Sequence, residues 1–399
     1  MNELPSSFNS GPPPDLSCLR SGFTAEGFDP YPHYDHLRSI APVCQANWGD
    51  WLISGYHAVL EAFQHPLCMS VRQPEDTYVD GSVSHFFNDW LLFLDPPAHT
   101  QLRRELLSLF TPASVSGFEN QIRKIAETLA PQAESGHTDF IHDFAQPFPV
   151  AVISEVLGLP QGERRQIVEW AAILRSAFDD RPCGPGRLED AASGMRKYFL
   201  DLVADPSWVS KHGQSKFRGL INSYPKEAVA AQLAFLLFAG HETTVHLLGN
   251  TFLQLALRPQ LWEQLRANPK LATAAIEEAL RFDSPIQKIC RTTASAVTIG
   301  GTDIPHGQTL VLLLGAANRD GKVFPHPHDF ILRIPNRQIA FGSGRHLCLG
   351  RSLALLEARI GLEVLLPRWR TVALEDGPRW YVNASFRGLE RLNLAWSGR

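Results

Sequence analysis

The sequence predicts a mainly α-helical fold with minor β-sheets (an α+β fold), and three observations support that class. Apolar residues recur at helical spacing from "DPPAHTQLRRELLSLF" (95–110) to "RPQLWEQL" (258–265). Strand-like patterns lie before and after this helical middle. No internal repeat, low-complexity tract or linker interrupts residues 40 to 390. We therefore expect a single domain over residues 31–399, preceded by a loosely ordered segment over residues 1–30.

The elements follow in chain order. "PHYDHLRSI" (32–40) predicts a short helix, and "VCQANWGDWLISGY" (43–56) predicts a hairpin that turns near Gly49 and Asp50. We expect "VTIGGTDIPHGQTLVLLLGAANRD" (297–320) to form strands, "RSLALLEARIGLEVLL" (351–366) to form an amphipathic helix, and strands to close the chain. We expect prolines to break the helical middle at Pro112, Pro147, Pro149, Pro160 and Pro225. We also expect residues 179–186 to form a mobile loop.

Composition excludes several classes of protein. The formal net charge is -4, whereas proteins that bind nucleic acid usually carry a basic excess. The six cysteines form no CxxC pair, which argues against a disulfide framework or a zinc ribbon and favours a reducing compartment. The sequence has no uncharged apolar run of about 18 residues, and its polar, proline-rich start does not resemble a signal peptide. We expect a soluble cytoplasmic protein with no nucleic-acid or membrane partner.

The stretch "FGSGRHLCLG" (341–350) concentrates residues that can carry chemistry. Its glycines permit unusual backbone angles and a close approach to a flat surface. The helix that starts after Cys348 brings free N–H groups and a positive dipole end to the sulfur, which favours a thiolate. A single cysteine is more often a small buried hydrophobe. Zinc would need about three more ligands where only His346 is near, and a thiol hydrolase would need a histidine base brought close by the fold.

The longer stretch "FGSGRHLCLGRSLALLE" resembles the haem-binding signature of the cytochromes P450. The resemblance implies the cytochrome P450 fold, with haem b between a long central helix and the helix that follows the cysteine loop. It also implies that Cys348 is the axial thiolate of the haem iron. Phe341 should pack near the sulfur, and Gly342, His346 and Gly350 should belong to the same cofactor-binding loop.

The stretch "LLFAGHETTVHLL" (236–248) is an apolar helix that breaks local rules, because a glycine, two threonines and an unpaired glutamate lie in its middle. By itself it fits a buried helix with a packing glycine and a solvated glutamate equally well. It also resembles the family's oxygen-binding groove, which implies roles for Ala239 and Gly240 beside the haem and for Glu242 and Thr243 in proton delivery. A bond from the Thr243 hydroxyl to the Ala239 carbonyl would open the helix locally.

Two further segments match the family. In "AAIEEALRFDSP" (274–285), Glu278 and Arg281 resemble the buried Glu-x-x-Arg pair beneath the haem. Many bacterial relatives carry a histidine where this chain has Gln338, so the third polar partner of the pair stays open, with Arg333 and Arg337 as the other candidates.

The haem propionates call for cations, and the resemblance supplies three of them. His99 and Arg103 share one helix face, and Arg291 lies where relatives place a propionate ligand on a strand. With "LLLGAANRD" (312–320), which also matches the family, the resemblance runs from about residue 30 to the C-terminus.

The resemblance implies a bacterial-type monooxygenase that inserts one oxygen atom of O₂ into an apolar small molecule, by hydroxylation or a related oxidation in secondary metabolism. No flavin or iron–sulfur domain fits in the remaining length, so NAD(P)H electrons should arrive through a separate ferredoxin and its reductase. Two alternatives are a peroxygenase that uses H₂O₂, whose known branch replaces the acid and threonine by Arg and Pro, and a non-catalytic haem-binding protein.

Similarity also assigns the substrate pocket and the surface for the electron donor. The pocket should be largely apolar, with one possible polar handle in Gln287; its predicted lining is Phe235, Phe238, Gln287, Ile289 and Phe386. The cysteine side of the haem should carry a basic patch that attracts an acidic ferredoxin, formed by Arg104, Arg345 and Arg351.

Overall fold

The computed structural model describes residues 28–70, 86–131, 135–160, 162, 164–178, 185–213 and 217–398. The predicted loose segment over residues 1–30 therefore lies outside the described residues up to residue 27. The predicted loop over residues 179–186 lies outside them up to residue 184, and a helix begins at Pro185.

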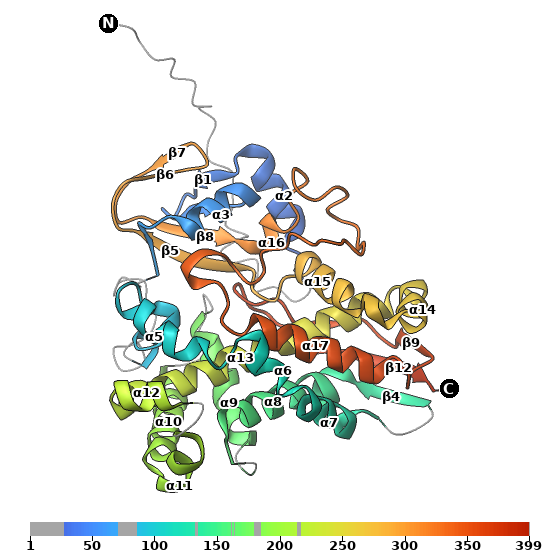
Figure 1. Ribbon diagram of the computed structural model, residues 1–399. Helices are drawn as coiled ribbons and strands as arrows, with labels where there is room; N and C mark the ends of the chain where they lie inside the picture. The colour runs from blue at the N-terminus through green and yellow to red at the C-terminus, as the bar shows by residue number, and fades with distance from the viewer. Residues whose placement is uncertain are drawn as a thin grey trace, which may run out of the picture.

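Helices make up most of the described chain and surround one long central helix, α13 (Figure 1). They are α2 (Tyr31–Ile40), α3 (Tyr56–Gln64), α5 (Ala98–Leu107), α6 (Pro112–Ser116), α7 (Glu119–Leu129), α8 (Pro147–Leu157), α9 (Arg164–Arg175), α10 (Pro185–Ala204), α11 (Pro206–Trp208), α12 (Arg218–Ser223), α13 (Lys226–Ala256), α14 (Pro259–Ala267), α15 (Ala272–Phe282), α16 (Leu314–Ala317) and α17 (Arg351–Leu365).

The strands form small sheets at the margins of the helical part. They are β1 (Val43–Gln45), β2 (Trp51–Ile53), β3 (Cys68–Met69), β4 (Ser135–Asp139), β5 (Lys288–Thr293), β6 (Val297–Ile299), β7 (Thr302–Ile304), β8 (Thr309–Leu313), β9 (Thr371–Leu374), β10 (Arg379–Trp380), β11 (Leu389–Arg391) and β12 (Asn393–Ser397). One sheet has the order β1-β2-β8-β5-β3, in which only the β2–β8 pair is parallel. The others are β4-β12-β9, β6-β7 and β10-β11.

Local sequence patterns predicted several of these elements correctly. The helix over 32–40 is α2, the helix over 351–366 is α17, and the first hairpin is β1–β2 with Gly49 at φ 100° in its turn. Pro112 and Pro147 begin α6 and α8, where a missing N–H removes no helical bond.

Three expectations about the elements were wrong. Pro149 does not break a helix, because it lies in the first turn of α8, whose N–H groups need no helical acceptor. The segment Ser135–Asp139 is a strand inside the helical middle, and it pairs with β12 from the far end of the chain. The strand-like run over 297–320 ends in a short helix, α16.

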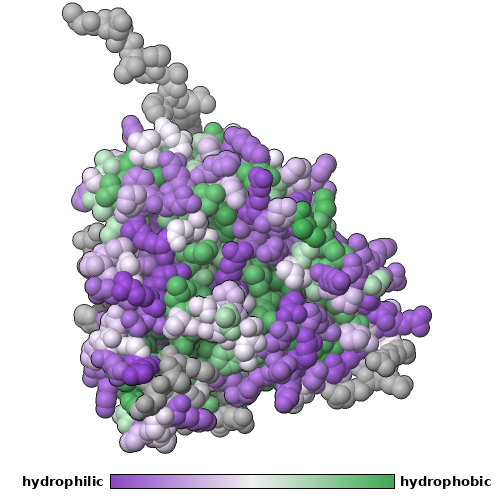
Figure 2. Space-filling model, in the orientation of Figure 1, coloured by the Kyte–Doolittle hydropathy of each residue, from purple (hydrophilic) through white to green (hydrophobic). Residues whose placement is uncertain are grey.

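The core centres on α13, which is buried over most of its length and packs against α8, α10, α15 and α17. Among the described residues, α13 is the one helix long and apolar enough to cross a membrane, but 72% of that window is buried inside the fold, as in a core helix. Figure 2 shows a face covered mainly by hydrophilic residues, with hydrophobic residues gathered towards its middle.

Candidate functional site

One stripe of α13 is open, although the rest of the helix is covered. From Val229 to Ala256 every residue is buried except Ala239, Gly240 and Thr243, which are half-buried. Thr243 lies four residues after Ala239 and three after Gly240, so it neighbours both on one side of the helix. We call Ala239, Gly240 and Thr243 the open stripe. Three of the four residues predicted for the oxygen-binding groove therefore share one half-buried face in the middle of the core, whereas the fourth, Glu242, is buried.

The open stripe carries the predicted hydroxyl contact. Thr243 Oγ1 donates to the Ala239 carbonyl at 2.8 Å, as expected, and Thr244 Oγ1 donates to the Gly240 carbonyl at 3.1 Å. The helix nevertheless runs unbroken from Lys226 to Ala256, so the expected local opening is not a break. Gly240 also has a packing role, because an added Cβ would come within 3.1 Å of Ile153 on α8.

The cysteine loop is a tight turn held against α3. The Cys348 N–H donates to the Phe341 carbonyl at 2.9 Å, and Gly342 and Gly344 have φ of 71° and 67°. At Gly344 an added Cβ would also lie 2.6 Å from the Phe63 carbonyl oxygen, so only glycine fits there. At Gly350 an added Cβ meets no described atom within 4 Å, and φ is -85°. Packing among described residues therefore does not explain Gly350.

The surroundings of Cys348 combine exposure with desolvation. Its side chain is exposed, yet the surrounding chain is dense enough that desolvation raises the pKa of the thiol. The N–H groups of Gly350 and Arg351 hydrogen-bond to the sulfur and, with Arg103, lower this pKa, but less than burial raises it. In the chain alone the start of the helix therefore favours the thiolate, as expected, but burial outweighs it. A metal ion bound to the sulfur would supply the positive charge that stabilises the thiolate form.

His346 of this loop contacts a second histidine, His99 on α5. The rings of His99 and His346 are 4.2 Å apart between centroids. His99 is 1% exposed, and neither of its ring nitrogens has a hydrogen-bond partner among the described residues. Burial, with His346 and Arg103 nearby, lowers the pKa of His99 to about 4. Buried imidazole nitrogens without partners suit an anionic or hydrogen-bonding ligand.

Cationic groups outnumber anionic ones at this place. One buried carboxylate, Asp95, accepts a hydrogen bond from the Ser70 N–H at 2.7 Å. Around it gather five side chains that can carry positive charge: Arg103, Arg291, Arg345, His99 and His346. Burial lowers the pKa of Arg291 to about 10, which reflects the cost of a cation in this setting. Two propionates would offset that excess, so the cluster fits haem.

The three arginines of this cluster differ in how many backbone carbonyls they bind. Arg103 Nη2 donates to the Leu347 carbonyl at 2.6 Å, and Arg291 Nη1 donates to the Cys290 carbonyl at 2.8 Å. Arg345 Nη2 donates to the His65 and Pro66 carbonyls at 2.9 and 2.8 Å, which fixes its guanidinium against the chain.

Glu242 does not stand free, as the sequence suggested, but forms a buried ion pair. Arg175 Nη1 donates to Glu242 Oε2 at 2.6 Å, and the two side chains are 14% and 5% exposed. Burial alone would raise the pKa of Glu242, but Arg175, together with His241 and His246, outweighs burial and holds that pKa below its ordinary value. The carboxylate thus faces α9, whereas its neighbour Thr243 belongs to the open stripe.

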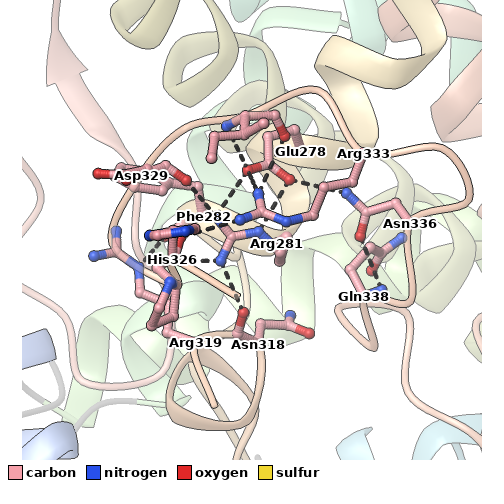
Figure 3. Close-up of polar contacts among 12 residues, drawn as sticks. Glu278, Arg281, Phe282, Asn318, Arg319, His326, Asp329, Arg333, Asn336 and Gln338 are labelled. Carbon is pink, nitrogen blue, oxygen red and sulfur yellow. Dashed lines mark hydrogen bonds and ion pairs between the residues drawn. The ribbon is translucent and has the colours of Figure 1, made fainter. Parts of the chain in front are cut away.

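Glu278 and Arg281 form the predicted buried pair (Figure 3). Arg281 donates through Nε and Nη2 to both carboxylate oxygens, at 2.9 and 2.8 Å. Arg333 Nη1 donates to Glu278 Oε1, and Asn336 Nδ2 donates to Oε2 at 3.0 Å. Arg333 is therefore a third partner of the pair, and Asn336 is a partner that the sequence analysis missed.

Among the described residues, neither Gln338 nor Arg337 makes a hydrogen bond or ion pair with Glu278. The Gln338 side-chain oxygen accepts from the Ala340 N–H at 2.7 Å, and the Arg337 carbonyl accepts from the Tyr56 hydroxyl at 2.7 Å. These contacts tie the segment before the cysteine loop to itself and to α3.

The predicted pocket phenylalanines belong to one aromatic cluster. Phe238 stacks on Phe178 at 5.5 Å between centroids, and Phe386 meets the same ring edge-on at 5.9 Å. Phe235 joins through Trp90, which contacts both Phe235 and Phe238. Sequence reasoning missed Phe178, because nothing around it in the sequence marks a pocket.

The remaining two predicted pocket residues lie on the sheet side. Ile289, on β5, is half-buried and packs against the core of the five-stranded sheet. Gln287 cannot serve as a polar handle, so that prediction was wrong. It is 0% exposed, its amide nitrogen donates to the Ser284 carbonyl at 2.7 Å, and its amide oxygen accepts from the Tyr34 hydroxyl at 3.1 Å.

Known proteins share this sequence and fold. Residues 196–384 match the family profile described as Cytochrome P450. The chain is 33% identical to the biotin biosynthesis cytochrome P450 of Bacillus subtilis (strain 168), over 92% of this chain and 96% of that protein. It is 32% identical to cytochrome P450 monooxygenase PikC of Streptomyces venezuelae, over 97% and 95%.

A solved structure agrees with these relatives. The crystal structure of P450BioI in complex with hexadec-9Z-enoic acid ligated acyl carrier protein matches with a TM-score of 0.86 and 34% identity, covering 92% of this chain and 98% of that one. Identity at this level over nearly the whole length of each relative goes beyond a shared fold. The chain therefore belongs to the cytochrome P450 family, whose members are haem-iron monooxygenases that use O₂.

Proposed function

We propose that residues 31–399 act as one haem-thiolate monooxygenase domain that inserts an oxygen atom into an apolar small molecule, with NAD(P)H electrons passed on by a separate ferredoxin and its reductase. The observation that carries the proposal is the exposed Cys348 thiol of the glycine loop, in a chain whose long core helix also has a half-buried stripe. The four cysteines in the described part of the chain form no disulfide, which favours a cytoplasmic location for the protein.

The described residues divide the work of holding the haem. Cys348 would be the iron ligand, with the N–H groups of Gly350 and Arg351 directed at its sulfur. The propionates would be held by His99, His346, Arg103 and Arg291. When bound, the haem supplies the iron that activates O₂, inserting one oxygen atom into a C–H bond while the other leaves as water.

The open stripe and Glu242 would handle protons. The Thr243 hydroxyl gives its hydrogen to the Ala239 carbonyl, so its oxygen lone pairs face outward and can orient a water as a proton donor. Glu242 is the adjacent ionisable group and would resupply that water from the α9 side. General acid–base help of this kind depends on a proton held within hydrogen-bond reach.

The pocket supports an uncharged, apolar reacting part of the substrate. Phe238 and Phe386 both contact Phe178, and Phe235 joins them through Trp90. With Gln287 bound elsewhere, none of the predicted pocket residues offers a charge or a free amide. A charged group placed among these rings would lose its hydration without a partner. The acyl chain in the P450BioI complex is one ligand of this chemistry, so a carrier-bound acyl group is a reasonable substrate to screen.

The structure narrows the patch proposed for the ferredoxin. Arg104 is exposed, and the Arg351 side chain is 47% exposed, with Glu277 at 4.0 Å. Arg345 is bound to backbone carbonyls and is better placed to hold the loop than to meet a partner. Arg104→Glu should slow turnover at limiting ferredoxin, and added salt should do the same. Turnover indifferent to both would count against this docking surface.

Cys348→Ala tests the haem ligand. The reduced protein with CO should lose the absorption band of a thiolate-ligated haem, whereas the matched variant Cys290→Ala should keep it. If Cys348→Ala retains the band, the ligand assignment is wrong.

A product assay tests the reaction. An apolar ligand that shifts the haem band from low spin to high spin is given with NADPH, ferredoxin and reductase, or with H₂O₂ alone. Product in the first assay and none in the second is expected. The reverse result would make the protein a peroxygenase, and haem binding without product in either assay would make it a non-catalytic haem protein.

A further inference from the structure

A second face of α13, beside the open stripe, carries buried polar groups. Phe238, Glu242 and His246 follow one another at intervals of four residues, so they lie along this face. The end of α9 and the turn over residues 381–388 pack on it, since Phe178 contacts Phe238 and Tyr381 contacts His246. Apolar contacts occupy one end of the face, and ionisable groups occupy the other.

Arg175 is shared between two partners at the ionisable end. It donates to Glu242 Oε2 at 2.6 Å, and its guanidinium carbon lies 4.0 Å from the centre of the Tyr381 ring. The Tyr381 hydroxyl also hydrogen-bonds with Arg175. A guanidinium held over an aromatic face is stabilised more strongly when it is removed from water. Tyr381 therefore helps to hold the Arg175 guanidinium, which in turn holds the Glu242 carboxylate.

The turn that carries Tyr381 is itself firmly seated. The Tyr381 N–H donates to the Gly388 carbonyl at 3.0 Å, which closes the turn. An added Cβ at Gly388 would fall 1.8 Å from His246 Nδ1, so the imidazole lies directly against this glycine. Ser385 Oγ donates to the Phe178 carbonyl at 2.7 Å, which joins the same turn to the end of α9. Tyr381 is thus held at a fixed position relative to Arg175.

A carboxylate that passes protons must be able to accept one. The ion pair with Arg175 opposes this, because protonation of Glu242 would leave a buried cation without its counter-charge. The other ionisable neighbours, His241 and His246, each have a nitrogen 3.8 Å from the carboxylate. Burial lowers the pKa of both histidines, and that of His246 to about 4, and both lower the pKa of Glu242 less than Arg175 does. Arg175 is then the dominant charge facing Glu242.

We propose that Tyr381 is a positioning residue for proton transfer through Glu242. Its ring and hydroxyl hold Arg175 in the ion pair, and this contact sets how readily Glu242 takes up a proton and passes it towards Thr243. The proposal rests on the proposed role of Glu242. It adds Tyr381, which lies in the turn over residues 381–388 and belongs to no sequence motif identified above.

The test compares the titration of Glu242 in variants of the haem-loaded protein. Infrared difference spectra between each protein and its Glu242→Gln derivative isolate the carboxyl band of Glu242 across a pH series. In Tyr381→Leu, which removes both ring and hydroxyl, the titration should move up by about one pH unit, because Arg175 is held less firmly. In Tyr381→Phe, which keeps the ring, the shift should be smaller. Tyr224→Leu is the matched control for a half-buried tyrosine elsewhere, and it should leave the titration unchanged.

Activity provides a second readout. The pH profile of product formed per NADPH should move in Tyr381→Leu by the same amount as the titration and should be largely rescued in Tyr381→Phe. If the Glu242 titration in Tyr381→Leu matches the wild type, or if Tyr224→Leu moves it equally, the role of Tyr381 is wrong. If the titration shifts but Glu242→Gln forms product normally, the proposed role of Glu242 fails, and with it the use of this contact in proton transfer.

Discussion

Glu278 and Arg281 form one buried ion pair, and Glu242 and Arg175 form another, yet the chain surrounds the two pairs differently. Arg281 meets both oxygens of Glu278 and also donates to the carbonyls of Asn318, Pro327 and Asp329 (Figure 3). Both of these side chains are 0% exposed. The Glu242 carboxylate has one hydrogen bond from Arg175 and two histidines at 3.8 Å.

The Glu278–Arg281 pair is fixed by its surroundings, whereas the Glu242–Arg175 pair can change its protonation state. A buried ion pair offsets its desolvation cost only when further hydrogen bonds satisfy the remaining donors and acceptors, as they do around Glu278. Such a pair has no alternative arrangement of comparable energy. The Glu242 pair leaves imidazole nitrogens without partners among the described residues and adjoins the open stripe. A change of protonation there disturbs few hydrogen bonds, which suits a group that handles protons.

The largest effect should come from breaking the fixed pair. Glu278→Ala leaves Arg281 buried without its counter-charge, at a cost of about 3–5 kcal/mol. That is a large part of a typical stability, so the yield of folded, haem-loaded protein should fall sharply. Haem content per protein and the urea midpoint measure the change. The neighbouring Glu277→Ala is the control, because Glu277 has only Arg351 at 4.0 Å and should cost little. Equal losses in the two variants would contradict the comparison.

Glu242→Gln should affect the rate more than the fold. Loss of the ionisable group should lower the rate of product formation by about 10²–10⁴-fold. The amide oxygen can still accept from Arg175, so the urea midpoint and haem content should change less than in Glu278→Ala. Glu155→Gln, on a carboxylate that accepts from the exposed Gln121, is the control and should keep the wild-type rate. An unaltered rate in Glu242→Gln would remove this glutamate from proton delivery.

Thr243→Ala should distinguish the role of the Thr243 hydroxyl from that of the Glu242 carboxylate. NADPH consumption and haem content should stay near wild type while product falls and H₂O₂ rises. The reason is that the variant has no hydroxyl to orient the water that donates protons. Thr244→Ala is the matched control, since Thr244 makes the same contact one residue on but is buried. Equal H₂O₂ release from both variants would argue that the open stripe has no special role.

The acid sensitivity of the protein should weaken when His246 is removed. The pKa of His246 is lowered from 6.5 to about 4, chiefly by burial. Between these values the unfolded chain binds a proton that the folded chain excludes, so stability falls as the pH drops from 6.5 towards 4. His246→Asn should flatten the dependence of the unfolding free energy on pH in that window, measured by urea unfolding. The exposed His142→Asn should leave the slope unchanged, and an unchanged slope in both variants would contradict the expectation.

Gln338→His should have the smallest effect. It installs the residue common in relatives, but Gln338 bonds within its own segment and does not contact Glu278 in this structure. The unfolding free energy should change by about 0.5 kcal/mol or less. Haem content should also stay constant. A loss comparable with that of Glu278→Ala would mean that Gln338 supports the fixed pair after all.

Local patterns in the sequence were enough for elements whose packing follows from their own periodicity. α2, α17 and the β1–β2 hairpin were predicted correctly from apolar spacing and a turn glycine. β4 was missed because "SGHTD" has no alternation of its own and becomes a strand by pairing with β12. α16 was missed because "LGAA" continues an apolar strand run and differs from it only in where the chain turns.

The sequence by itself determined the chemistry available at the site. The glycine loop around Cys348, the Glu-Thr pair within an apolar helix and the Glu-x-x-Arg spacing are local, and each is visible without knowledge of the fold. The resemblance implied His99, Arg103 and Arg291 as cations for the propionates and His346 as a residue of the cofactor-binding loop, and the fold brings His99 and His346 into contact. The Thr243 contact was predicted correctly because both of its atoms belong to one helix turn.

Only the tertiary structure decided which partners these groups have. Arg175 lies 67 residues from Glu242, Tyr34 lies 253 from Gln287, and Arg333 lies 55 from Glu278. A buried polar group takes the donor or acceptor that packing brings within about 3 Å, and residue spacing along the chain does not encode that choice. For this reason the sequence marked Glu242 as a candidate for proton delivery, whereas the fold decided that it pairs with an arginine from α9 that also contacts Tyr381.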